Sequence, residues 1–206
     1  MRLRDDVQST RLISRDSGLL DLSLLAGLTT SVVTRGTEGD DVIVGSSRSD
    51  VIDGRGGDDT ISSSGGADVV RGGTVFGVVS GGADADMLSG DAGADLLDPG
   101  AGAGTASGNA GNDVIVAGSG VGVVRGGDDA DIVVASTGGG TASGDAGNDL
   151  VHGAEASDTT VVQGGAGTDV CIATARQLIV QGCETTMRVP ATDAPAPTIT
   201  VTGGPR

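Results

Sequence analysis

The sequence predicts an all-β solenoid, in which short parallel strands stack in coils and two nine-residue units form each coil. The main observation is a repeat, because thirteen consecutive units of nine residues fill residues 36–152 without a gap. The second is composition: the 206 residues include 39 glycines and one phenylalanine, with no tryptophan or tyrosine. A core without large aromatic side chains is thin and suits two closely spaced backbone layers.

The eighth position of every unit is apolar. Its residues are Ile43, Ile52, Ile61, Val70, Val79, Leu88, Leu97, Ala106, Ile115, Val124, Val133, Ala142 and Val151. Positions 7–9 therefore predict a three-residue strand whose middle residue points inward. Such short strands are stable when each coil stacks on the previous one. An eleven-residue unit at 153–163 interrupts the register, and residues 164–172 restore it. Much glycine and charge is also typical of disorder, but a disordered chain does not keep such a register.

The sixth position is aspartate or glycine in every unit. The aspartates, including one in the restored unit, are Asp41, Asp50, Asp59, Asp68, Asp86, Asp95, Asp113, Asp131, Asp149 and Asp169. The glycines are Gly77, Gly104, Gly122 and Gly140. Positions 1–6 predict a turn, since glycine supplies backbone angles that other residues avoid and aspartate or asparagine tolerates them. Aspartates that only solvate turns would not explain this restriction to two residue types.

Several units resemble a known motif. GTEGDDVIV (36–44), GNAGNDVIV (108–116), GDAGNDLVH (144–152) and GGAGTDVCI (164–172) are similar to the nonapeptide G-G-x-G-x-D-x-U-x of the repeats-in-toxin, or haemolysin-type, calcium-binding family. The resemblance covers residues 36–172. It implies a right-handed parallel β-roll in which the ten sixth-position aspartates and backbone carbonyls hold Ca²⁺. Calcium takes hard oxygen ligands of these two kinds.

Alternate units share one edge of such a roll, so their sixth positions form two rows. The first row is Asp41, Asp59, Gly77, Asp95, Asp113, Asp131, Asp149 and Asp169. The second row is Asp50, Asp68, Asp86, Gly104, Gly122 and Gly140. An ion held between two stacked turns needs an aspartate from each. We therefore expect a continuous calcium row on the first edge in the C-terminal half, and a glycine-lined, ion-free edge opposite.

The charge of the chain excludes some partners. Twenty-eight acidic residues against twelve arginines, with no lysine, give a formal charge of -16, which argues against binding nucleic acid. No stretch approaches the ~18 apolar residues of a membrane span. The first 28 residues make a poor signal peptide, because Asp21 interrupts the apolar run. We expect a fragment of a longer secreted protein, or export by another signal.

Two cysteines lie near the C-terminal end. Cys171 occupies an inward eighth position, and QLIVQGCE (177–184) predicts a last strand. A bridge between Cys171 and Cys183 would clamp this strand over the final coil and contribute roughly 3 kcal/mol. The alternative is two buried free thiols in a reducing cell. The acidic, calcium-binding repeat favours the disulfide.

These patterns divide the chain into four parts. Residues 1–35 are expected to form an N-terminal cap, with Leu19–Leu28 as a short helix or an extra strand. Residues 36–172 are the predicted β-roll. Residues 173–189 are expected to be a C-terminal capping strand with the disulfide, and residues 190–206 a Pro/Thr/Gly tail or linker.

The sequence holds no set of residues typical of an active site. The single histidine, His152, falls at an outward ninth position, and the chain has no lysine or tyrosine. We predict a secreted, non-enzymatic module that folds on calcium binding and has a structural, spacer or adhesive role, with an unidentified partner outside the cell. One alternative is an ice-binding β-solenoid, since flat solenoids can present threonine arrays; Thr105 and Thr141 recur in two GTAS segments, but the sequence shows no regular threonine ladder. Another is the accessory repeat region of a secreted hydrolase.

Overall fold

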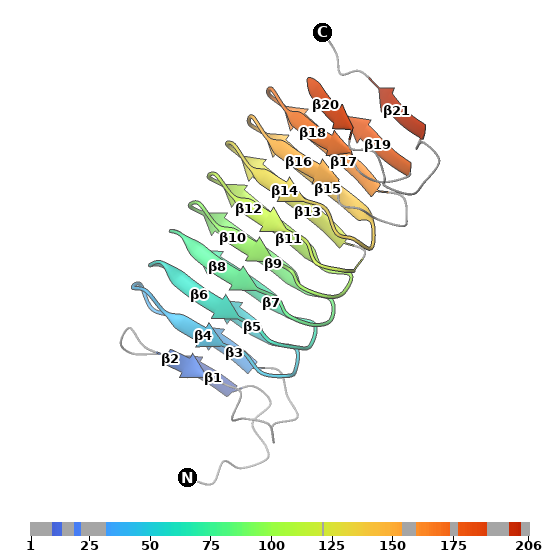
Figure 1. Ribbon diagram of the computed structural model, residues 1–206. Coiled ribbons are helices and arrows are strands. Elements are labelled where there is room, and N and C mark those ends of the chain that lie inside the picture. The colour runs from blue at the N-terminus through green and yellow to red at the C-terminus, as the bar shows by residue number, and fades with distance from the viewer. Residues whose placement is uncertain are drawn as a thin grey trace.

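The computed structural model describes residues 10–13, 19–21, 32–120, 122–153, 160–173, 177–188 and 198–202. Every regular element within these residues is a β-strand of three to seven residues. Successive strands alternate between two sheets, so the chain winds as a β-solenoid whose coils stack along one axis (Figure 1). No helix in the described part of the chain is long and apolar enough to cross a membrane.

Each sheet collects every second strand, and all neighbouring strands are parallel. The eleven-stranded sheet contains β1 (Thr10–Ile13), β3 (Val32–Arg35), β5 (Val51–Asp53), β7 (Val69–Gly73), β9 (Met87–Ala92), β11 (Thr105–Ala110), β13 (Gly122–Asp128), β15 (Gly140–Ala146), β17 (Thr160–Ala166), β19 (Gln177–Gln181) and β21 (Thr198–Thr202). The ten-stranded sheet contains β2 (Leu19–Asp21), β4 (Val42–Val44), β6 (Asp59–Ser62), β8 (Gly77–Ser80), β10 (Leu96–Asp98), β12 (Val114–Val116), β14 (Ile132–Val134), β16 (Leu150–Gly153), β18 (Val170–Ala173) and β20 (Thr185–Arg188).

The pairing register confirms that two nine-residue units form one coil. Ala106 of β11 pairs with Val124 of β13, eighteen residues further on, and Ile115 of β12 pairs with Val133 of β14 at the same separation. The separation grows to twenty between β16 and β18, where Val151 pairs with Cys171. The two extra residues of the eleven-residue unit therefore leave the pairing intact.

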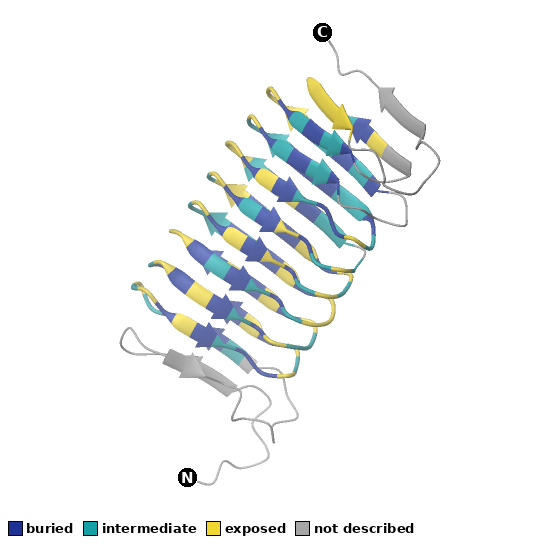
Figure 2. Cartoon of the chain, in the orientation of Figure 1, coloured by how far each residue is buried: buried dark blue, intermediate teal, exposed yellow. Residues whose placement is uncertain are grey.

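The core is the predicted ladder of eighth-position residues. All thirteen are buried, and the ladder continues through Val162, Cys171 and Val180. Their neighbours at positions 7 and 9 point outward; Val42 and Val116, for example, are more than 40% exposed. Figure 2 shows this alternation of buried and exposed residues along the strands. Each nine-residue unit contributes one ladder residue to this thin core, which explains why small aliphatic residues suffice.

The N-terminal end adds strands to both sheets. In the leucine-rich segment, Leu19–Asp21 is the strand β2, which pairs with β4. The strand alternative therefore holds for these residues, while residues 22–31 lie outside the described part. β1 pairs with β3 and extends the other sheet by one strand.

The C-terminal end corrects one prediction. β19 is not the last strand, because β20 pairs with β18 and β21 pairs with β19. β21 falls within the residues expected to be a tail or linker. Its sequence TITVT is rich in β-branched residues, which favour a strand. By pairing with β19, this strand satisfies backbone groups that would otherwise be unpaired at the edge of the sheet.

The predicted disulfide is present. Cys171 in β18 is bonded to Cys183, with a Cα–Cα distance of 6.0 Å. Cys171 is completely buried in the inward ladder, one step before Val180. The bridge therefore ties the segment after β19 to the core of the coil that contains β18.

Candidate metal centre

The turns that connect the two sheets depend on unusual backbone angles. In the unit that begins at Gly108, the second-position Asn109 and the fourth-position Gly111 both have positive φ, at 79° and 121°. A side chain on Gly111 would overlap the carbonyl oxygen of Gly93 in the preceding coil. Asparagine tolerates such angles and glycine favours them. These requirements explain the similar letters GNAGND (108–113) and GDAGND (144–149), and they place the sixth residue where the next strand begins.

The sixth-position aspartates are the most buried charged residues of the described chain. None of the ten is more than 2% exposed. They lie where each turn enters a strand, in two rows along opposite edges of the roll, as the alternation of units predicts. Carboxylates are almost never buried so fully without a partner.

Hydrogen bonds connect the aspartates of each row. The backbone N–H of Asp95 donates to Oδ1 of Asp113 at 2.7 Å, and the N–H of Asp113 donates to Oδ1 of Asp131 at 2.7 Å. The described residues contain seven such aspartate pairs; they are 41/59, 95/113, 113/131, 131/149 and 149/169 in the first row, and 50/68 and 68/86 in the second. The structure thus brings together the same pairs that the sequence predicts.

The second carboxylate oxygen of most of these residues has no protein partner. Within the described residues, a buried Oδ2 without a hydrogen bond occurs in Asp59, Asp68, Asp86, Asp95, Asp113, Asp131, Asp149 and Asp169. Burying an ionised oxygen without compensation is costly. A bound cation would remove that cost.

Glycine at the first position makes room for the unpartnered oxygen. A Cβ built on Gly108 would overlap Oδ2 of Asp113, and it would lie 2.7 Å from the carbonyl oxygen of Gly126 in the next coil. The equivalent Cβ on Gly81 would lie 2.6 Å from Oδ2 of Asp86. A carboxylate oxygen and a main-chain carbonyl therefore converge on the bare face of a glycine. We call this arrangement the glycine cradle.

In the sequence, glycine at the first position of a unit accompanies aspartate at the sixth. Where the sixth position is glycine, three of four units have a Cβ at the first position, namely Pro99, Ala117 and Ala135. Among the ten units with aspartate, Ser63 is the only first-position residue that is not glycine. The first position is thus free to carry a side chain once the carboxylate is gone.

The donor set fits a hard divalent cation. No group of three or more His, Cys, Asp or Glu side chains close enough to hold a metal occurs in the described ranges. An ion in a cradle would therefore take much of its coordination from main-chain carbonyls as well as from carboxylates. Calcium accepts that mixture, whereas zinc prefers nitrogen and sulfur ligands.

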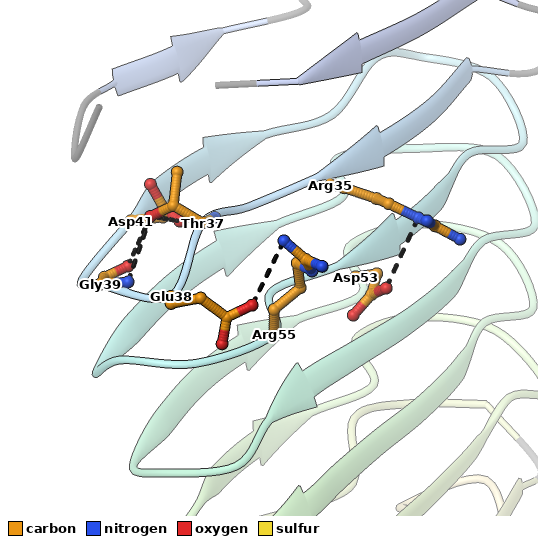
Figure 3. A network of polar contacts seen from close by, with 7 residues as sticks. All are labelled: Arg35, Thr37, Glu38, Gly39, Asp41, Asp53 and Arg55. Atoms are coloured by element: carbon orange, nitrogen blue, oxygen red, sulfur yellow. Dashed lines mark hydrogen bonds and ion pairs between the residues drawn. The ribbon is translucent and has the colours of Figure 1, made fainter. Parts of the chain in front are cut away.

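The first turn on each edge carries a feature that the repeat pattern did not predict. Oδ2 of Asp41 accepts hydrogen bonds from the backbone N–H and the hydroxyl of Thr37, at 2.5 and 3.0 Å (Figure 3). Ser46 does the same for Oδ2 of Asp50, at 2.7 and 2.9 Å. These two carboxylates are partly satisfied without an ion. A hydroxyl residue at the second position supplies both hydrogen bonds in each case, but it does not identify such carboxylates by itself, because Ser64 also holds a second position and Oδ2 of Asp68 has no partner.

The raised pKa values of the buried aspartates indicate that their charge is poorly compensated when no ion is bound. Burial raises the pKa of Asp95 to about 7, with an opposing contribution from the N–H of Gly77 and a further increase from Asp113. Burial also raises the pKa of Asp131 to about 7 and that of Asp59 to about 6. When no cation compensates the charge, these carboxyls therefore keep a proton to a higher pH than an ordinary aspartate does.

Acidification should therefore stabilise the calcium-free β-roll. The folded-state pKa of Asp95 and Asp131 lies above the ordinary value of 3.8, so the folded chain binds more protons between about pH 4 and 7. The free energy of unfolding should fall as pH rises through that window. Circular dichroism in EDTA should show more β structure at pH 5 than at pH 7.5. Equal signals, or a loss of β structure at pH 5, would contradict this.

The fold and the glycine cradles define a metal-binding repeat protein with oxygen ligands. Comparison with known families agrees: the model of the RTX calcium-binding nonapeptide repeat matches residues 35–70, 71–106, 107–142 and 125–160. The chain belongs to this family. Its nonapeptide repeats bind Ca²⁺, and the fold supports calcium binding by this β-roll. A search of curated proteins gave no match.

Proposed function

We propose that the chain is a secreted, non-enzymatic calcium-binding module that folds on calcium binding and acts as a structural, spacer or adhesive element. The unpartnered Oδ2 atoms above glycine cradles carry this proposal. Each of the ten predicted aspartates would supply a carboxylate to a site between two coils. Seven divalent ions, one for each aspartate pair, would nearly cancel the formal charge of -16.

The proposed unit is residues 36–172, with residues 1–35 and 173–189 as its caps. The strands that flank the repeat support this division, because β2 and β20 pair with β4 and β18 at the ends of one sheet. Pairing at both ends would cover strand edges that otherwise invite association with other chains.

A role other than catalysis is supported by the surroundings of His152. This residue is half-buried on the outward face of β16, and its lateral neighbours in the sheet are Val134 and Ile172. Neither neighbour can orient an imidazole or share its proton. The disulfide supports an oxidising compartment outside the cell.

The threonines do not favour the ice-binding alternative. Thr105 and Thr141 both pair with Val123, and Thr141 pairs with Val161 on its other side. Val123 thus separates the two threonines across the sheet, so they form no continuous array.

The proposed ligands can be tested by counting bound calcium. Asp113 belongs to two aspartate pairs, whereas Asp41 belongs to one and already accepts two hydrogen bonds from Thr37. We expect Asp113→Asn to remove two ions per chain in equilibrium dialysis and Asp41→Asn to remove at most one. Equal losses would contradict the pairing, and a calcium-bound crystal structure with ions beside Gly104, Gly122 and Gly140 would contradict the one-sided row.

A further inference from the structure

The first carboxylate row does not end with the nonapeptide repeat. The backbone N–H of Asp169 donates to Oε2 of Glu184 at 2.7 Å. In the preceding coil, the N–H of Asp149 donates to Oδ1 of Asp169 at 2.9 Å. Glu184 therefore occupies the place that the next sixth-position aspartate would hold. It lies only fifteen residues after Asp169, so the repeat register does not reveal it.

Gly182 completes the same replacement on the main chain. A Cβ on Gly164 would lie 2.6 Å from Oδ2 of Asp169 and would overlap the carbonyl oxygen of Gly182. The backbone N–H of Gly165 also donates to that carbonyl, at 3.2 Å. The carbonyl oxygen of Gly182 thus lies beside Gly164 as the carbonyl oxygen of Gly126 lies beside Gly108. The short segment from Gly182 to Glu184 reproduces one wall of a glycine cradle.

The disulfide holds this segment in place. Cys183 lies between Gly182 and Glu184, and its partner Cys171 is two residues beyond Asp169 in the buried ladder. One covalent bond therefore fixes both oxygen donors relative to Asp169. The strand β20, which follows Glu184 directly, pairs with β18, so the disulfide adds a covalent tie to this pairing.

An unpartnered oxygen points to a ligand here. Oδ2 of Asp169 has no hydrogen bond, and the residue is 0% exposed. We propose that Asp169, Glu184 and the carbonyl of Gly182 form a terminal calcium site outside the nonapeptide register, and that the Cys171–Cys183 disulfide positions its ligands. This inference rests on the calcium binding proposed above. Glu184 is exposed, so the terminal site is open to solvent on one side.

The arrangement makes the last site sensitive to reduction. An external dithiol that transfers two electrons and two protons converts the bridge into two thiols and itself becomes a disulfide. The segment from Gly182 to Glu184 then loses its covalent tie to the ladder, and we expect its two oxygen donors to be held too loosely to keep the ion. The sites between earlier coils keep theirs.

The test counts calcium ions on the oxidised chain, on Glu184→Gln, and on a variant with Cys171→Ala and Cys183→Ala. Glu38→Gln is the matched control, because it removes one exposed carboxylate at the opposite end, where Glu38 pairs with Arg55 at 3.3 Å (Figure 3). We expect Glu184→Gln and the cysteine variant each to bind one ion fewer than the parent chain. Combining the three substitutions should remove no further ion. The control should bind as many ions as the parent.

Each other outcome has a defined meaning. A Glu184→Gln chain that binds as many ions as the control would overturn the terminal site. A cysteine variant that keeps the ion, or loses more ions than Glu184→Gln, would overturn the positioning role of the disulfide. Reduction of the calcium-loaded parent chain should reproduce the loss of one ion without any substitution. A parent chain that binds no calcium at all would instead contradict the proposed function.

Discussion

Replacing Gly108 with alanine should lower the free energy of unfolding of the calcium-loaded chain by about 1–3 kcal/mol, the usual cost of forcing an extra carbon into a packed site. The new Cβ would overlap Oδ2 of Asp113 and crowd the carbonyl of Gly126, so it fills the glycine cradle. Urea unfolding in saturating calcium measures the effect. Gly65→Ala is the matched control, because a Cβ there would meet nothing within 4 Å.

A second substitution tests whether the carboxylate of Asp113, and not crowding by the main chain alone, makes glycine necessary at position 108. In the unit that begins at Ala117, the first position carries a Cβ and the sixth position is Gly122. The alanine at position 108 should therefore cost much less in an Asp113→Gly background than in the parent chain. An equal cost in both backgrounds would show that the carboxylate does not determine the need for glycine.

The periodic part of the structure could be predicted because every coil repeats the same constraints. An inward residue such as Ile115 must be apolar, and a turn residue such as Gly111 must tolerate positive φ and close stacking. Both requirements recur every nine residues, so they specify strands, register and the two aspartate rows together. The fold and the strand pairing can therefore be predicted by dividing the chain into units of nine residues.

The nine-residue pattern does not predict features that do not recur in every unit. Thr37 and Ser46 are recognised only after the turn geometry places their hydroxyls against Asp41 and Asp50. Glu184 lies outside the register and reaches the row through the disulfide, so spacing alone cannot find it. The β21 strand depends on an unpaired edge that exists only after β19 has joined its sheet.

The same geometry explains why calcium and folding should be coupled. The core is one side chain deep, and the chain carries a formal charge of -16. Without cations, repulsion and buried carboxylates oppose the compact state. Ions that bind only the folded coils stabilise them by mass action. We therefore expect several ions to bind as the coils form, in one cooperative transition.

The most direct measurement is a calcium titration of EDTA-treated chain at pH 7.5, followed by circular dichroism and by hydrodynamic radius. We predict an expanded calcium-free chain that gains β structure and becomes compact in a single steep transition, with magnesium far less effective because it demands tighter octahedral geometry. A chain that is fully folded in EDTA and unchanged by calcium would contradict the coupling of the aspartate rows to folding.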